Sequence, residues 1–244
     1  LEPALGGPDT TERVRTVMAL RLKRLAAGDD CYNLNLADNF GAKGKLTVTP
    51  TATTTVASPC PVPETGGYSG FEHYLYRIEI AEPLAGQARF KWSQFNGGLV
   101  GRGVLHVSGT TKTVTITAND QMINQCGLNS FWIEVLVEDP SLGHWRSTFT
   151  ANATLVGGEL QLTNDSGAWP TDGSGNYADC FIRLWNGIEL ISAFTATGTA
   201  AKELPNHVGI HPSFDAPAAD LSNYRPGDYW TFPVRAGGVD ATWI

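Results

Sequence analysis

Short segments in which apolar and polar residues alternate recur along most of this chain of 244 residues. Successive side chains of a β-strand point to opposite faces, so a period of two predicts strands with one buried face. Several of the segments place β-branched or aromatic residues at alternate positions, and strands favour these residue types. We expect strands at residues 45–49, 73–80, 88–93, 99–107, 111–117, 131–138, 145–150, 159–163, 181–185, 188–194 and 229–235.

The basic segment 13–23 bears most directly on the fold class, because its Arg and Lys residues would also suit the polar face of a helix. Its apolar residues, among them Val14, Met18 and Leu22, share one parity, and the basic residues take the other. This alternation favours a half-exposed strand, with a helix as the alternative.

Turn residues are frequent, with 27 Gly and 14 Pro. Turn signals such as Asn96-Gly97-Gly98, Gly157-Gly158 and Asn186-Gly187 separate the expected strands at short spacing, which is typical of sandwiches and barrels. Asn186-Gly187, between two apolar runs, is the strongest hairpin signal. We therefore predict an all-β, antiparallel sandwich or barrel with little helix.

We expect residues 1–244 to form one β-rich module, with a possible small-barrel sub-module at 110–165. Two Pro-, Gly- or Thr-rich stretches, 50–70 and 201–227, are predicted to be long loops and candidate partner surfaces. Because the chain opens on Leu1 within a Pro/Gly-rich turn, we expect it to be a fragment or domain of a longer protein.

Charge and hydropathy exclude two classes of partner. The 24 Asp and Glu exceed the 17 Lys and Arg, giving a net charge of −7, and a nucleic-acid partner needs a clustered basic surface. No apolar run reaches the roughly 18 residues that a membrane-spanning helix needs. We predict neither nucleic-acid binding nor a membrane span.

The four cysteines are spaced too widely for a zinc site. Two disulfides would fit an exported protein, and nearest neighbours would pair Cys31 with Cys60 and Cys126 with Cys180. All three pairings remain open from the sequence, as do four buried free thiols.

No familiar catalytic motif is present. The stretch GGLVGRG, residues 97–103, precedes a strand rather than a helix, so a twisted or bulged strand explains it better than a phosphate loop. No Gly-x-Ser-x-Gly elbow occurs. Glu134 and Glu138 share a strand face, where exposed charges are normal, although a catalytic carboxylate pair can come from any two strands. We expect no catalytic residues and no cofactor other than a possible calcium ion.

The loop DGSGNYAD offers the best metal candidate. Its hard oxygens lie at Asp172, Ser174, Asn176 and Asp179, which resembles the spacing of a calcium loop, although it lacks the Gly and Glu of an EF-hand. A turn held by side-chain bonds to the backbone is the alternative. Aromatic rings in this polar region, Trp169 and Tyr177, are candidates for ligand contact, for instance by stacking on a sugar.

Three motifs in order resemble a known family. PALGGPDTTERVRTV, FEHYLYRIEIAEPLAGQARFKWSQFNGG and YRPGDYWTFPVR together are similar to a bacterial family of uncharacterised β-rich domains, often encoded beside phage-tail-like contractile injection systems. The similarity runs from about residue 3 to 243. The family carries no established catalytic residues. In the second motif, the alternate charges Arg77, Glu79, Arg89 and Lys91 are available to pair across two strands.

The resemblance implies an extracellular or particle-associated protein whose partners are other subunits of the particle. We therefore expect a non-enzymatic structural or attachment module. The alternatives are a carbohydrate-active enzyme and a glycan-binding module, both consistent with a β-rich chain that is 10% aromatic.

Overall fold

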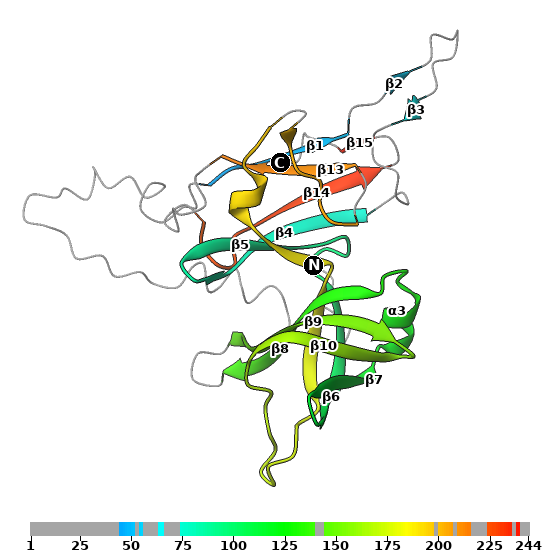
Figure 1. Cartoon of the computed structure of the whole chain (residues 1–244), viewed down its shortest axis with the longest axis vertical. Coiled ribbons are helices and arrows are strands. Elements are labelled where there is room, and N and C mark those ends of the chain that lie inside the picture. Colours follow the sequence, from blue (N-terminus) through cyan, green and yellow to red (C-terminus); the bar gives the residue numbers. More distant parts are fainter. Residues whose placement is uncertain are drawn as a thin grey trace, which may run out of the picture. The chain divides into compact units, whose positions relative to one another are not determined.

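A computed structural model describes residues 44–51, 54–55, 63–65, 74–139, 144–197, 200–206, 209–215, 224–235 and 238–239 (Figure 1). The chain divides into two compact units. The first, which we call the barrel unit, contains Gly98–Gly187, and the second, the sheet unit, is built from the chain on either side, within Lys23–Gly97 and Ile188–Ile244. The predicted strand at 13–23, the first of the three motifs, Cys31 and Cys60 lie outside the described residues.

The barrel unit is a closed antiparallel barrel in the strand order β10-β7-β6-β11-β8-β9 (Figure 1). Tight turns join β6 to β7 and β9 to β10, whereas the short helix α3 and an irregular segment make the two longer crossings. The elements are β6 Leu99–Ser108, β7 Thr111–Ala118, α3 Asp120–Gln125, β8 Ser130–Asp139, β9 His144–Val156, β10 Glu159–Gly167 and β11 Cys180–Trp185. This barrel extends beyond both ends of the sub-module predicted at 110–165.

The barrel interior is filled by alternate side chains of every strand, as the period of two requires. Ile133, Ile182 and Leu160 are fully buried there. β6 contributes glycines: a Cβ on Gly103 would lie 2.6 Å from Cγ1 of Val114 on the neighbouring strand. The pairing of β6 with β7 also shifts between Arg102 and Gly103. The glycine-rich stretch therefore forms a bulged strand, as predicted.

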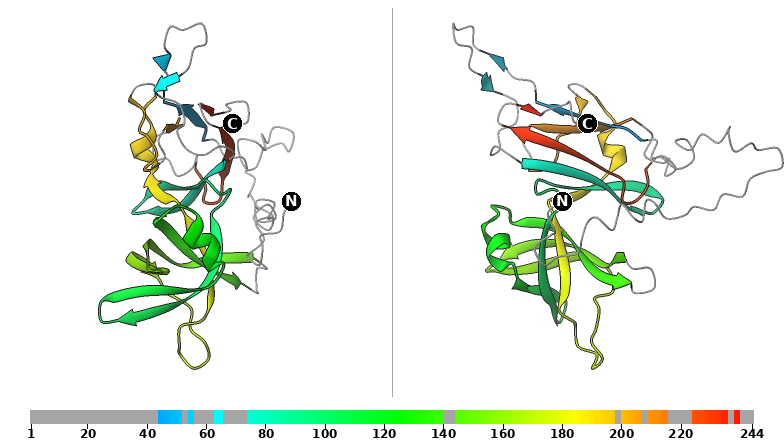
Figure 2. Two further views of the ribbon diagram at one scale, coloured as in Figure 1. Left: turned by 90° about the vertical axis from the view of Figure 1, so that its right-hand side faces the viewer. Right: turned by 180° about the vertical axis from the view of Figure 1, so that it is seen from behind.

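The sheet unit contains a five-stranded sheet, β12-β5-β4-β14-β15, and a two-stranded antiparallel ribbon, β1 with β13 (Figures 1 and 2). A further small pair, β2 with β3, precedes β4. The elements are β1 Leu46–Pro50, β2 Thr54–Thr55, β3 Pro63–Thr65, β4 Tyr74–Leu84, β5 Gln87–Ser93, β12 Gly187–Leu190, the 3-10 helix η2 Ile191–Phe194, β13 Ile210–Phe214, β14 Tyr229–Arg235 and β15 Gly238–Val239.

One face of the five-stranded sheet packs with η2 and the β1–β13 ribbon to form the core of this unit. Aromatic rings dominate it: Phe90 lies 4.9 Å from Phe214 and 5.0 Å from Phe194, measured between ring centroids. The ring of Tyr76 stacks on that of Phe232 at 5.7 Å. Both arrangements are within the range that favours aromatic pairs. The predicted all-β antiparallel fold is confirmed.

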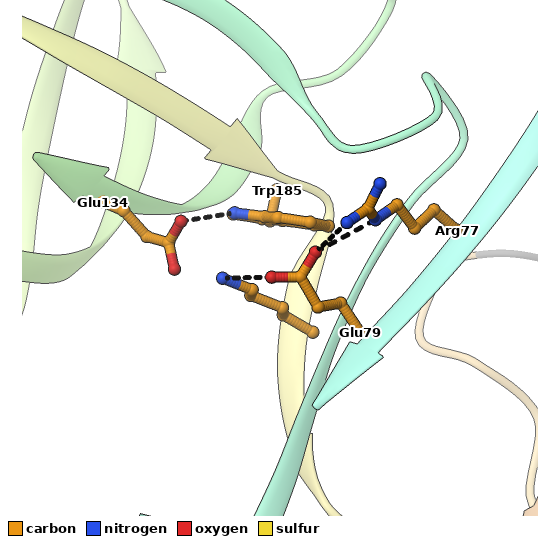
Figure 3. A network of polar contacts seen from close by, with 5 residues as sticks. Arg77, Glu79, Glu134 and Trp185 are labelled. Atoms are coloured by element: carbon orange, nitrogen blue, oxygen red, sulfur yellow. Dashed lines mark hydrogen bonds and ion pairs between the residues drawn. The ribbon is translucent and has the colours of Figure 1, made fainter. Parts of the chain in front are cut away.

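The opposite face of β4 and β5 carries paired charges. The Glu79 carboxylate binds Arg77 Nη2 at 2.6 Å and Lys91 Nζ at 3.2 Å, and all three side chains are buried (Figure 3). A buried carboxylate is costly unless it is paired, so two cations on one carboxylate satisfy it. Glu79 and Lys91 are register partners, as expected from the sequence, whereas Arg89 instead donates to the Glu82 carbonyl at 3.0 Å.

Two local predictions were wrong. Asn186-Gly187 does not form a hairpin, because β11 belongs to the barrel whereas β12 pairs in the five-stranded sheet. The predicted loop 50–70 contains the paired strands β2 and β3, and the stretch 201–227 is not wholly a loop either, because residues 210–214 form β13, paired with β1 over five residues. The Ile-x-Pro-x-Phe alternation in β13 is short and contains Pro212, which hid it among the other prolines of that stretch.

Cys126 and Cys180 are both free thiols, so the nearest-neighbour disulfide between them does not form. Cys180 is buried at the start of β11, and Cys126 follows α3, where its thiol donates to the Ile123 carbonyl at 3.1 Å. Desolvation raises the pKa of both thiols, which disfavours the reactive thiolate.

Candidate functional site

The predicted calcium loop, which connects β10 to β11, is held together by its first carboxylate. Asp172 Oδ1 accepts hydrogen bonds from the backbone N–H groups of Ser174 and Asn176 at 2.8 and 2.9 Å. These bonds, led by that of Asn176, lower the pKa of the fully exposed Asp172 carboxyl. Side-chain bonds to the backbone therefore shape this turn, as the sequence alternative predicted.

Asp179, the last residue of the predicted calcium set, binds strands of the barrel. Its Oδ2 accepts from Arg102 Nε at 3.2 Å, its carbonyl accepts from Arg102 Nη2 at 2.8 Å, and its Oδ1 accepts from Thr117 Oγ1 at 2.9 Å. Its bonds thus go to β6 and β7, while those of Asp172 stay within the loop. Among the described residues, no three His, Cys, Asp or Glu side chains gather as metal ligands.

The two aromatic residues predicted to contact a ligand lie in different environments. Trp169 is only 5% exposed, because its ring packs edge to face on Phe149 and its indole N–H donates to the Ala178 carbonyl at 2.9 Å. Its ring is therefore not available for stacking on a sugar. Tyr177 pairs with Thr171 across the loop and is 42% exposed, so its ring remains accessible.

A second pair of aromatic rings lies on the outer wall of the barrel. Trp145 on β9 and Phe181 on β11 are half-buried, with ring centroids 5.2 Å apart in an edge-to-face arrangement. The guanidinium carbon of Arg102 lies 4.6 Å from the centre of the Phe181 ring. We call Arg102, Thr117, Trp145, Asp179 and Phe181 the barrel-wall cluster. They come from β6, β7, β9 and β11 and from the residue before β11.

The cluster combines an aromatic surface with fixed polar groups. The Arg102 and Asp179 side chains are 38% and 42% exposed. An ion pair this exposed contributes at most about 1 kcal/mol to stability, so its main effect is to fix the position of both charged groups. Two of the five N–H donors of Arg102 bond to Asp179. Such a site can pack an aromatic ring against a small ligand and hydrogen-bond its hydroxyl groups.

Sequence reasoning placed Trp145 in a strand but gave it no role. Strand parity shows that a side chain faces outward, but not which side chain of a distant strand lies beside it. Phe181 and Trp145 meet only because β11 and β9 flank β8 on either side, with Leu136 opposite Phe181 and Glu138 opposite Trp145.

Of the two carboxylates considered for glycoside hydrolysis, Glu134 is held in a structural hydrogen bond. Glu134 is buried and its Oε2 accepts a hydrogen bond from the Trp185 indole N–H at 3.0 Å (Figure 3). Glu138 follows four residues along the same strand, which at about 3.3 Å per residue places the two backbones about 13 Å apart.

Comparison with known proteins finds no matching family model, no matching curated protein and no matching solved structure. No helix in the described part of the chain is long and apolar enough to cross a membrane.

Proposed function

We propose that this protein is an attachment module of an extracellular, phage-tail-like particle, and that it binds glycans through the barrel-wall cluster. The observation that carries the binding role is the half-buried Trp145–Phe181 pair beside the ion pair of Arg102 and Asp179. The resemblance of the chain to domains encoded beside contractile injection systems supports the particle role.

The chemistry of the cluster suits a pyranose ring. One side of such a ring carries mainly C–H groups, which pack against an aromatic face, and its rim carries hydroxyl groups. Arg102 offers N–H donors and Asp179 offers acceptor oxygens at fixed positions. A sugar hydroxyl group can therefore accept a hydrogen bond from Arg102 or donate one to Asp179. Aromatic and Arg side chains are also the residues that most often dominate binding energy at protein interfaces.

Binding is tested by titrating the full chain against a panel of bacterial and host polysaccharides. Trp145→Ala is expected to weaken binding at least tenfold, because truncation removes the largest apolar contact. Tyr177→Ala tests the loop instead, and Met122→Ala, which truncates a 51% exposed residue on α3, is the matched control. Binding that survives Trp145→Ala, or flat curves across the panel, would contradict a glycan site on the barrel wall.

The particle role has a separate test. Extracellular particles purified from the source organism are expected to contain this polypeptide, detected by mass spectrometry, at a constant ratio to the other subunits. Preparations that contain intact particles but lack the polypeptide would contradict the assembly role. The proposed glycan site would then be judged by the polysaccharide titration alone.

A further inference from the structure

The outward face of the β1–β13 ribbon carries hydroxyl groups and one imidazole. Leu46 and Val48 of β1 face the core, so the alternate residues Thr47 and Thr49 face outward. His211 lies opposite Thr49. The Thr51 backbone N–H donates to the Gly209 carbonyl at 3.1 Å, which extends the ladder by one residue. Thr51 and His211 therefore lie on the same face of the ribbon.

The imidazole of His211 is held at both nitrogens. Its Nδ1 lies 3.0 Å from the Ala201 carbonyl oxygen, and its Nε2 lies 2.8 Å from Thr51 Oγ1. A carbonyl oxygen only accepts, so Nδ1 carries the proton. In the neutral ring Nε2 then carries a lone pair and no proton, so the Thr51 hydroxyl donates a hydrogen bond to it. The geometry fixes the tautomer in which His211 acts as a base toward Thr51.

The backbone on either side limits the movement of these groups. His211 lies between Ile210, which is fully buried, and the buried Pro212. Thr51 follows Pro50, which ends β1, and is tied by its own N–H to Gly209. A hydroxyl, a base that accepts its proton and a third group that orients the base form the general arrangement of an activated nucleophile.

We propose that Thr51 and His211 form a nucleophile–base dyad that hydrolyses small O-acyl esters, with the Ala201 carbonyl as the positioning group. Thr51 Oγ attacks the ester carbonyl carbon while its proton passes to His211 Nε2. The bond from that carbon to the alcohol oxygen breaks, and the alcohol takes the proton. Water then attacks the carbonyl carbon of the acyl-threonine, the bond from that carbon to Thr51 Oγ breaks, and the proton of the water passes through His211 to Thr51 Oγ. The sum is ester plus water to acid plus alcohol, with no other reactant.

This activity goes beyond attachment and lies in the sheet unit, so it is tested independently of the barrel wall. The probe is p-nitrophenyl acetate, added to the full chain, with release of p-nitrophenol followed by absorbance and the modified residue located by peptide mass spectrometry. We expect a burst of p-nitrophenol and an acetyl group on Thr51. His211→Ala is expected to slow acetylation of Thr51 about 100-fold, because a positioned general base contributes about 10² to 10⁴ in rate.

Matched controls separate the dyad from general surface reactivity. Thr51→Ala should abolish the burst, whereas Thr49→Ala, on the same face, and His106→Ala, on an exposed position of β6, should leave it unchanged. Acetylation of Thr51 no faster than that of Thr49, or a burst that survives Thr51→Ala, would overturn the proposal.

A second measurement uses the unsubstituted protein and so does not depend on how the variants fold. Long-range ¹H–¹⁵N NMR spectra distinguish the two neutral tautomers of a histidine. At a pH where the ring is neutral, His211 is expected to carry its proton on Nδ1. A proton on Nε2 would make the ring a hydrogen-bond donor to Thr51 and would contradict the proposed role of His211 as the base.

Discussion

At the scale of single residues, the barrel depends on the absence of a side chain on β6. Gly103 faces the interior, where a Cβ would lie 2.6 Å from Val114 Cγ1 and 3.1 Å from the Thr115 carbonyl oxygen. Real Cβ atoms do not approach so closely, so a strand or a side chain must move. Gly173, in the loop before β11, has no atom within 4 Å of the same position.

Gly103→Ala is therefore expected to lower the free energy of unfolding by about 1 to 3 kcal/mol, the usual cost of overpacking a core. Gly173→Ala is the matched control and should change it by less than about 0.5 kcal/mol, as surface substitutions usually do. Urea denaturation of both variants measures the difference. Equal midpoints for the two would show that the barrel relaxes around the added methyl group.

Some features of single residues at and near the candidate site could be predicted from the sequence, and others could not. The bulge on β6 was predictable, because repeated glycines in a strand usually mark one. The burial of Trp169 was not, because a polar neighbourhood in sequence says nothing about Phe149, which comes from another strand and covers the ring. The bonds from Asp179 to β6 and β7 depend on contacts that are equally distant in sequence.

At the scale of elements, the turn between β4 and β5 is tighter than the sequence suggested. The seven-residue connection expected between these strands, residues 81–87, is mostly strand, and only Ala85 and Gly86 form the turn. Both have positive φ, 49° and 77°, as in the type I′ turns that suit the twist of a hairpin. Ala85 adopts this conformation at a cost that Asn or Gly largely avoids.

Ala85→Asn is expected to stabilise the protein by about 0.5 to 1 kcal/mol, because Asn tolerates positive φ and the Asn-Gly pair is the preferred type I′ sequence. Gly86→Ala should act in the opposite direction. Thermal unfolding of the two variants beside the unsubstituted chain gives the sign directly. A lower melting temperature for Ala85→Asn would show that the turn does not limit stability here.

The elements themselves were largely predictable, and their partners were not. Each of the strands expected from residues 45 to 235 is present at least in part, because the period of two reports one-sided burial wherever it occurs. Asn186-Gly187 has the local chemistry of a hairpin, yet β11 pairs with β6 and β8 instead. Partner choice depends on which strands bury each other's faces, and local turn signals carry no information about that.

At the scale of the whole molecule, the described part of the barrel unit lies within one continuous segment of chain, Gly98–Gly187, whereas the sheet unit is discontinuous. A closed barrel pairs all of its strands internally and leaves no sheet edge. Gly98–Gly187 expressed alone is therefore expected to fold, with dispersed amide resonances and a cooperative urea transition. A collapsed product with a broad transition would instead show that the barrel needs the remainder of the chain.

Pairing of β6 with β11 has a consequence for how the discontinuous sheet assembles. Leu99 and Leu184 are register partners, so the closed barrel holds the two points where the chain leaves it close together. β5 and β12 pair in the sheet although about 90 residues separate them in sequence. Once the barrel has formed, its closed strands hold the ends of this long segment together, so little further loop-closure entropy is lost when β5 and β12 pair. A barrel that forms first would thus set the refolding rate of the sheet, and a substitution that slows barrel closure, such as Gly103→Ala, would delay strands it never touches.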